Sequence, residues 1–190
     1  MDEAAKQVVS DVEPALPMTS GQPRREDHHY QRQGVQAVFA FVDPLKGWRR
    51  VTHRDSRTRR DWAEEVQQLL DVDDPHAERM TLVCDNLNTH DIASLDARFD
   101  AATAHRLARR LRIVHTPRNG SWLNMAEIEL SVLTRQCLGR RFDSVAEMGE
   151  AIAAWQNRRN AARCGTHWRF TTADARIKLR SLYPAPDELR

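Results

Sequence analysis

Apolar and polar positions along the chain predict a β-hairpin in its first third. Residues 34–42 and 48–53 are rich in valine, phenylalanine and other residues that favour strands. Residues 43–47 between them include Pro44 and Gly47, which are typical of a turn. The preceding residues 7–33 are polar and contain three prolines, so they predict an irregular connection, with room for a short strand near Val8 and Val9.

Helical and strand patterns alternate after this hairpin. Thr58 and Asp61 form a predicted capping box, and apolar residues then recur at helical spacing from Trp62 to Leu70. Short apolar runs predict strands at 80–84 and 111–115, separated by a mixed helical region whose clearest part is residues 100–111.

Three more helices are predicted towards the end of the chain. The first covers about residues 125–138, and the second begins at Ser144, capped by Glu147. The third begins at Thr171, capped by Asp174, and continues through Leu182 to Pro184.

This order of elements predicts the fold class, α/β: a mixed sheet with helices packed on it, in one domain of 190 residues. A ribonuclease-H-like fold fits the order best among named folds. The order alone does not separate it from other mixed α/β folds, and the sequence contains no internal repeat or low-complexity tract.

Composition argues against several classes of protein. The longest uninterrupted apolar run, residues 37–42, is too short to cross a bilayer, and no charged and then apolar leader opens the chain. The three cysteines have no paired spacing. We therefore expect a reduced intracellular protein with neither a disulfide framework nor a zinc site, and with no membrane partner.

The charges are segregated although their net value is only +2. Residues 49–60 contain six arginines and one acid, and residues 105–118 contain five arginines and no acid. Clustered guanidinium groups suit phosphate, because their planar fork binds two oxygens at once. An alternative is that arginine simply replaces lysine throughout this protein, since only three lysines occur.

Two carboxylates stand where a metal site would need them. Asp85 directly follows the strand predicted at 80–84, and Glu127 lies in the first turn of the helix predicted near 125. Carboxylate oxygens suit Mg²⁺ or Mn²⁺ better than cysteine or histidine would. Two such ions about 4 Å apart can activate a water or hydroxyl group and stabilise the leaving oxygen in phosphodiester cleavage. The pattern thus favours a metal-dependent phosphoryl-transfer enzyme.

Each of these residues also has a purely structural interpretation. Asp85 is placed to bond its own backbone in a turn. Asn124 and Glu127 have the spacing of a capping box. Glu129 is the rival carboxylate, but two residues further on it faces another side of the helix. His90 is more simply a packed residue than a phosphate contact.

Two longer motifs resemble a known family. Residues 85–90 (DNLNTH) and 116–127 (TPRNGSWLNMAE) resemble the catalytic domain of mariner-like bacterial insertion-sequence transposases, which belong to the DDE (Asp, Asp, Glu) superfamily of endonucleases. The resemblance continues through residues 135–138 and 170–179 and reaches back to residues 1–3. It covers nearly the whole chain and is more specific than an isolated pair of acids.

The resemblance implies a ribonuclease-H-like fold and two Mg²⁺ (or Mn²⁺) ions. The family's catalytic residues and metal ligands fall on Asp2, Asp85 and Glu127, with Asp2 bridging the ions. Such enzymes cut the ends of a mobile element with water, and the released 3′-hydroxyl then attacks target DNA. The protein would be cytoplasmic and associated with the bacterial nucleoid.

Its partner would be double-stranded DNA, at the element ends and the target, together with a second copy or an intact transposase. The arginine clusters would hold the DNA backbone, and Trp122 is alternatively a loop anchor in the core. The candidate DNA contacts are Asn86, Asn88, His90, Arg118, Asn119, Trp122, Arg135, Arg140 and Arg141. Asn86, Asn88 and His90 could instead contact the metal ligands and hold them in place.

The sequence departs from the family at its beginning. Family members carry an upstream helix-turn-helix domain and a strand leading into the first aspartate, whereas only Met1 precedes Asp2 here. We therefore expect residues 1–190 to be a single catalytic domain, truncated at its N-terminus, that lacks most of its first central strand and leaves Asp2 on a frayed end.

Three functions remain open at this point. The chain is an active transposase catalytic domain, an inactive remnant that binds DNA or the intact transposase, or a structure-specific nuclease of the same fold. Whether it is an enzyme depends on how well Asp2 is held.

Overall fold

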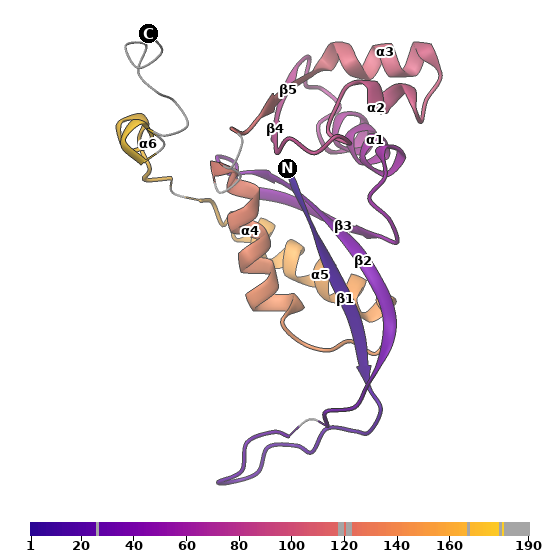
Figure 1. The fold of residues 1–190 in the computed structure, drawn as a ribbon, viewed down its shortest axis with the longest axis vertical. Helices are drawn as coiled ribbons and strands as arrows, with labels where there is room; N and C mark the ends of the chain where they lie inside the picture. Colours follow the sequence, from indigo (N-terminus) through magenta and orange to yellow (C-terminus); the bar gives the residue numbers. More distant parts are fainter. Residues whose placement is uncertain (26, 118–119, 121–122, 167, 179, 181–190) are drawn as a thin grey trace.

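A curved antiparallel sheet forms the centre of the protein, which we describe from a computed structural model (Figure 1). The structure describes residues 1–25, 27–117, 120, 123–166, 168–178 and 180. The sheet has the strand order β1-β2-β3, and its strands are Asp2–Asp11 (β1), Tyr30–Asp43 (β2) and Trp48–Arg54 (β3). The predicted hairpin is therefore confirmed as β2 and β3.

Strand β2 is covered on both faces, which explains its uninterrupted apolar run. Alternate residues of a strand point to opposite faces, so Phe39 and Phe41 enter one core while Val38 and Ala40 enter another. The first core lies against α1 (Arg59–Gln68), which contributes Trp62.

The second core lies between the sheet and two helices. These are α4 (Met125–Leu133), which continues as a π-helical turn over Thr134–Leu138, and α5 (Val145–Ala161). Leu133 and Trp155 are among its buried members. Both helices begin where the sequence predicted.

Strand β1 differs from the expectation for the beginning of the chain. Residues 7–33 were predicted to be irregular, but β1 reaches Asp11 and β2 begins at Tyr30. Strand β1 covers ten residues beginning at Asp2, and Asp2 pairs with Ala40 instead of fraying. Because β1 is an edge strand rich in alanine and polar residues, its hydrophobic pattern was too weak to predict it.

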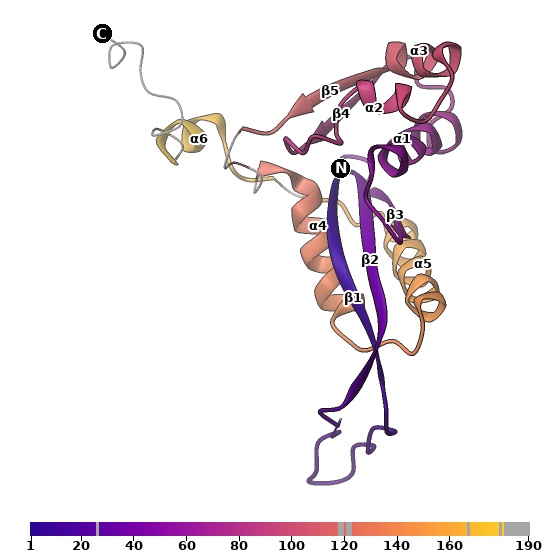
Figure 2. The ribbon, with the colours of Figure 1, turned by 45° about the vertical axis from the view of Figure 1, so that its right-hand side comes forward.

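Residues 12–25 and 27–29 project beyond the sheet as the two sides of a long loop, which Figure 2 shows clearly at one end of the molecule. Two isolated bridges, Leu16–Arg25 and Thr19–Gln22, hold the two sides of this loop together. At its base the pairing of β1 and β2 shifts by one residue next to Gly34, whose φ of +118° suits glycine alone.

A parallel pair of strands lies at the other end of the sheet. Strands β4 (Met80–Cys84) and β5 (Leu111–His115) have the predicted bounds and are joined through α2 (Ala93–Asp96) and α3 (Ala101–Arg110). Their buried residues Leu82 and Leu111 belong to the same core as Trp62.

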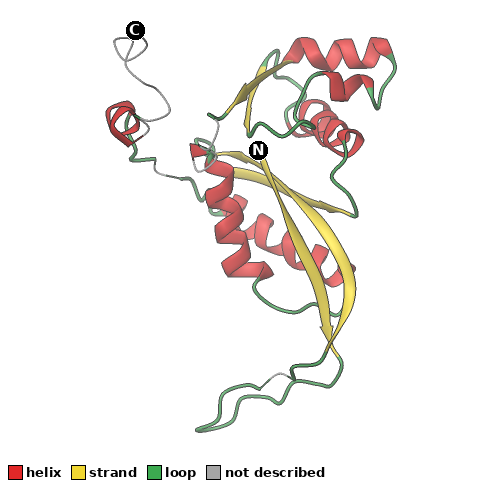
Figure 3. Ribbon diagram, viewed as in Figure 1, coloured by secondary structure: helices red, strands yellow, loops and turns green. Residues whose placement is uncertain are grey.

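The secondary structure in Figure 3 is thus a mixed α/β arrangement of antiparallel and parallel strands flanked by helices. It is compatible with the predicted ribonuclease-H-like fold. The last described helix, α6, covers Thr172–Lys178, whereas Leu182 and Pro184 lie outside the described residues. Within the described residues, no helix has both the length and the apolar character needed to cross a membrane.

A buried ion-pair network joins β3, α4 and α5. Arg49 Nε lies 2.8 Å from Glu129 Oε1, and Arg159 Nε donates to the same oxygen at 2.9 Å. The side chain of Asn160 binds both backbone groups of Arg49. Its Oδ1 accepts from Arg49 N at 2.9 Å, and its Nδ2 donates to Arg49 O at 2.8 Å. The network anchors α4 on the side opposite to the one that carries Glu127.

Replacing Glu129 with alanine should destabilise the fold strongly. Arg49 is 1% exposed and would keep a buried charge without its carboxylate, which typically costs about 3–5 kcal/mol of unfolding free energy. Guanidinium denaturation measures this loss. Glu150→Ala, on the exposed surface of α5, is the control and should change stability by less than about 0.5 kcal/mol. Equal effects of the two substitutions would contradict a structural role for the network.

Candidate active site

Three carboxylates are placed at the ends of three different elements. Asp2 is the first residue of β1, Asp85 directly follows β4, and Glu127 lies in the first turn of α4. The backbone nitrogen of Met1 donates to the carbonyl of Val83 in β4. This bond sets the beginning of β1 beside the end of β4, so Asp2 and Asp85 lie at one place in the fold.

Asn124 connects the beginning of α4 to the beginning of β1. Its Oδ1 accepts from Ala126 N at 3.2 Å, which caps the helix, and its Nδ2 donates to Met1 O at 2.8 Å and to Asp2 Oδ2 at 3.4 Å. Sequence reasoning treated Asn124 only as a helix cap paired with Glu127. The structure shows the cap acting through Ala126, and the sequence analysis missed that Asn124 also belongs to the site.

Asp2 lies within electrostatic range of the other two carboxylates. Burial is the main cause that raises this pKa from 3.8 to about 6, and the negative charges of Asp85 and Glu127 raise it further. The backbone N–H of Glu3, which donates to Asp2 Oδ1 at 2.8 Å, acts in the opposite direction. Asp2 is 7% exposed, so water screens these charges little.

The neighbouring Glu3 is a second buried acid at this place. Its side chain is 4% exposed, and burial raises its pKa to about 7 although the guanidinium of Arg57 opposes the change. Asp85 and Asp2 add negative charge around it. The region therefore concentrates more acid than the sequence analysis assigned to it.

The chemistry of these residues suits a divalent cation, but their arrangement is open. Within the described residues, no three histidine, cysteine, aspartate or glutamate side chains form a group that could enclose a metal ion. Asp85 Oδ1 is engaged by Leu87 N at 3.3 Å and lies 2.7 Å from His90 Nδ1, which leaves Oδ2 for another partner. Hard carboxylate oxygens of this kind suit Mg²⁺ or Mn²⁺.

Comparison with known proteins identifies the family. The sequence model for the DDE superfamily endonuclease family matches residues 1–149, a span that contains Asp2, Asp85 and Glu127. The chain belongs to the DDE superfamily endonuclease family. Membership assigns this DDE domain a transposase or nuclease type of function with DNA as its substrate. No curated protein and no solved structure matches the chain.

Around the carboxylates of the DDE domain, the predicted neighbours take different positions. Asn86 Nδ2 donates to Thr116 O and so fastens the segment after β4 to the segment after β5, whereas Asn88 is exposed. His90 is fully buried, so the structure does not support it as a direct DNA contact. His115 Nε2 lies 2.9 Å from His90 O and serves packing.

The arginines predicted to contact DNA are also of two kinds. Arg135 is exposed and lies on the face of α4 that carries Glu127 and Ser131, continued through the π-helical turn. Arg140 stacks on Phe142, 4.3 Å from the ring centroid, and pairs with Glu147 at 2.8 Å. Arg141 pairs with Asp11, and Arg118, Asn119 and Trp122 lie outside the described residues.

The first arginine cluster divides between the interior and the surface. Arg49 and Arg50 are buried in ion pairs, and Arg54 pairs with Glu65 at 2.7 Å. The remaining arginines of this cluster, which are exposed, are Arg57, Arg59 and Arg60. The proposal that the clusters hold DNA therefore applies to the second half of this cluster only.

Substitution of Asp2 by asparagine should change how stability depends on pH. Because the pKa of Asp2 is higher in the folded chain, unfolding free energy falls as pH rises from about 4 to 6 and stays lower above that range. An increase from 3.8 to about 6 corresponds to about 3 kcal/mol. Asp2→Asn should therefore be more stable than the wild type at pH 8, by about 1–3 kcal/mol, and nearly equal to it at pH 4.

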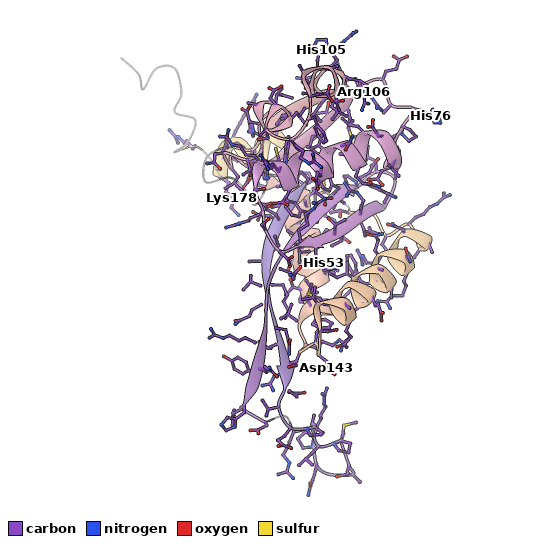
Figure 4. All side chains as sticks on the ribbon, turned by 90° about the vertical axis from the view of Figure 1, so that its right-hand side faces the viewer. His53, His76, His105, Arg106, Asp143 and Lys178 are labelled. Carbon is purple, nitrogen blue, oxygen red and sulfur yellow. The ribbon has the colours of Figure 1, made fainter. Side chains whose placement is uncertain are left out.

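Urea denaturation at pH 4, 6 and 8 checks this expectation. The matched control is Asp143→Asn, at an exposed acid before α5 that is labelled in Figure 4. A loss of stability at pH 8 in Asp2→Asn would contradict the assignment of Asp2 as an acid whose pKa is raised by burial and by neighbouring negative charges.

Proposed function

We propose that this protein is the catalytic domain of a mariner-like bacterial insertion-sequence transposase. It cuts element ends and joins them to target DNA, using two divalent ions held by Asp2, Asp85 and Glu127. The observation that carries the proposal is the meeting of the ends of β1, β4 and α4, which bear Asp2, Asp85 and Glu127 and are joined by the bonds of Met1 to Val83 and of Asn124 to Asp2. Family membership and the two long motifs support it.

Mg²⁺, when bound by these carboxylates, would lower the pKa of water and stabilise negative charge on the phosphodiester oxygens. Asp2 must be ionised to hold a cation, and a pKa of about 6 leaves it mostly ionised at pH 7. Its burial weakens competition from water and so strengthens its attraction for a cation. Asn124 keeps Asp2 close to α4, and Leu87 N restrains one oxygen of Asp85.

DNA would approach this site over exposed arginines. Arg57 Nη1 lies 4.0 Å from Glu3 Oε1, which places one exposed guanidinium at the edge of the carboxylates. Arg135 follows Glu127 by about two helical turns, roughly 12 Å along α4 and the start of the π-helical turn that continues it. Phosphate contacts at both positions would hold double-stranded DNA across the site. A second copy of the chain or an intact transposase would complete the assembly in the bacterial cytoplasm.

A second candidate is a protein that binds DNA or the intact transposase without cutting. The open arrangement of the carboxylates favours it, because no group of three acids encloses a cation site within the described residues. Calorimetry with Mn²⁺ separates the candidates, since tight binding of two ions argues against an inactive remnant. A preference for branched DNA over inverted-repeat ends would instead favour a structure-specific nuclease.

Asp85→Ala and Glu127→Ala should each abolish Mg²⁺-dependent DNA nicking. Loss of residues that merely support a metal ligand costs about 10–100-fold, so loss of a direct ligand should cost at least about 100-fold. The rate of conversion of supercoiled to nicked plasmid measures the effect, with Glu150→Ala as the control. Undiminished nicking by both variants would remove the catalytic assignment.

Arg135→Ala should weaken DNA binding to a similar extent for all sequences, because a phosphate contact reads no bases. The slope of log affinity against log salt concentration should fall by about one. Fluorescence anisotropy with short duplexes provides both quantities. The control is Arg106→Ala on α3, where Arg106 is committed to Asp71 at 2.7 Å and 2.8 Å. An unchanged salt slope for Arg135→Ala would contradict the proposed contact.

A further inference from the structure

Strand β4 has an edge that pairs with no other strand of the described residues. In a parallel pair, alternate residues direct both of their backbone groups to the same neighbour. Cys84 O accepts from Thr116 N at 2.9 Å on the side of β5, whereas Val83 O accepts from Met1 N on the opposite side. Val83 and Thr81 therefore turn their backbone groups away from β5. Among the described residues, Met1 N is the only backbone group that meets this edge.

Strand β2 has an open edge at the same place. Its pairing with β1 begins at Ala40, opposite Asp2, whereas its pairing with β3 continues as far as Asp43, opposite Trp48. In the part of the chain that the structure describes, residues 41–43 are thus paired on the side of β3 alone. Figures 1 and 2 both show the beginning of β1, marked N, between the central sheet and the pair of β4 and β5.

The two open edges border one hollow of about 1200 Å³. Residues 41–43 and 80–83 line it, together with Met1, with Leu69 of the first core and with Ala126 of α4. Pockets for small ligands typically measure about 300–1,000 Å³, so this hollow has room for several residues of a peptide.

The shape and chemistry of the hollow suit a strand. A strand that continued the line of β1, antiparallel to β2, would have residues 41–43 on one side and Thr81 and Val83 on the other. Alternate residues of a strand point to opposite faces, so every second side chain would face Leu69 and Leu82 of the first core. Apolar residues at those positions would extend this core.

We propose that the hollow is an acceptor site, in which an extended apolar segment of a partner polypeptide adds a strand between β2 and β4. Strand addition takes its affinity from backbone hydrogen bonds and its specificity from alternate side chains. The added strand would join the three-stranded and the two-stranded sheets into one. It would also hold β4 against the central sheet. The inference goes beyond the proposed function and requires no bound cation.

Hydration of the open edges is the competing explanation, because water also satisfies exposed backbone groups. The probe is the acetylated and amidated peptide Lys-Val-Thr-Val-Thr-Val-Lys, added to the 190-residue chain. Binding should slow amide hydrogen exchange at Thr81 and Val83 by about 10-fold or more, whereas exchange at Leu82, whose N–H faces β5, should change little. No slowing at the solubility limit of the peptide would overturn the proposal.

A matched peptide separates strand pairing from simple apolar binding. It has the same side chains but carries N-methyl groups on its three valines, which therefore cannot donate hydrogen bonds. We expect it to bind at least about 10-fold more weakly than the first peptide. Equal affinity of the two peptides would overturn the proposal, since the hollow would then bind apolar groups without pairing a strand.

Thr81→Pro tests the edge of β4 itself. Proline removes the N–H that faces the hollow and leaves the bonds to β5 in place, and it is tolerated where that N–H points away from a paired strand. The peptide should bind at least about 10-fold more weakly to this variant. Thr81→Val keeps the N–H and should stay within about 3-fold of the wild type. Unchanged binding to Thr81→Pro would overturn the proposal.

Two further outcomes have a defined meaning. If Thr81→Pro does not fold, the comparison of the two peptides on the wild-type chain decides. If the amides of Thr81 and Val83 are protected without peptide and lose this protection on dilution, a second copy of the chain occupies the hollow. That result would overturn the assignment to a different polypeptide.

Discussion

The hydrogen bonds that Asn124 donates to Met1 O and Asp2 Oδ2 hold the beginning of α4 against the beginning of β1. Glu127 lies on that helix and Asp2 on that strand, so this side chain holds together the two elements that carry these acids. Asn124 is 3% exposed, and water competes little for its hydrogen bonds. The candidate active site therefore depends on Asn124, a residue whose side chain is not acidic.

Bringing acids together in this way has a cost in stability. Burial and like charge raise the pKa of Asp2 to about 6 and that of Glu3 to about 7, which means that their ionised forms oppose folding near neutral pH. A bound cation would offset this repulsion at Asp2. In the interior, by contrast, Glu129 is paired with Arg49.

The arginines show how one residue type serves two purposes. Arg49 and Arg50 neutralise buried carboxylates, and Arg50 also stacks 4.6 Å from the centroid of Phe41. Arg57 and Arg135 remain exposed. Sequence spacing does not distinguish these groups, because burial depends on which helix packs over each position. Net charge and clustering alone consequently overstate the surface available for DNA.

The sequence by itself determined the hairpin, the strands 80–84 and 111–115 and most helix beginnings, because periodicity, capping and turn residues act over a few neighbouring positions. It also contained the motifs that led to the family. Tertiary structure decided the rest. Strand β1 forms because β2 offers it a paired edge, although its own pattern is weak. The burial of Asp2, the reach of Asn124 and the bond of Met1 to Val83 join residues distant in the chain, and no local pattern encodes such contacts.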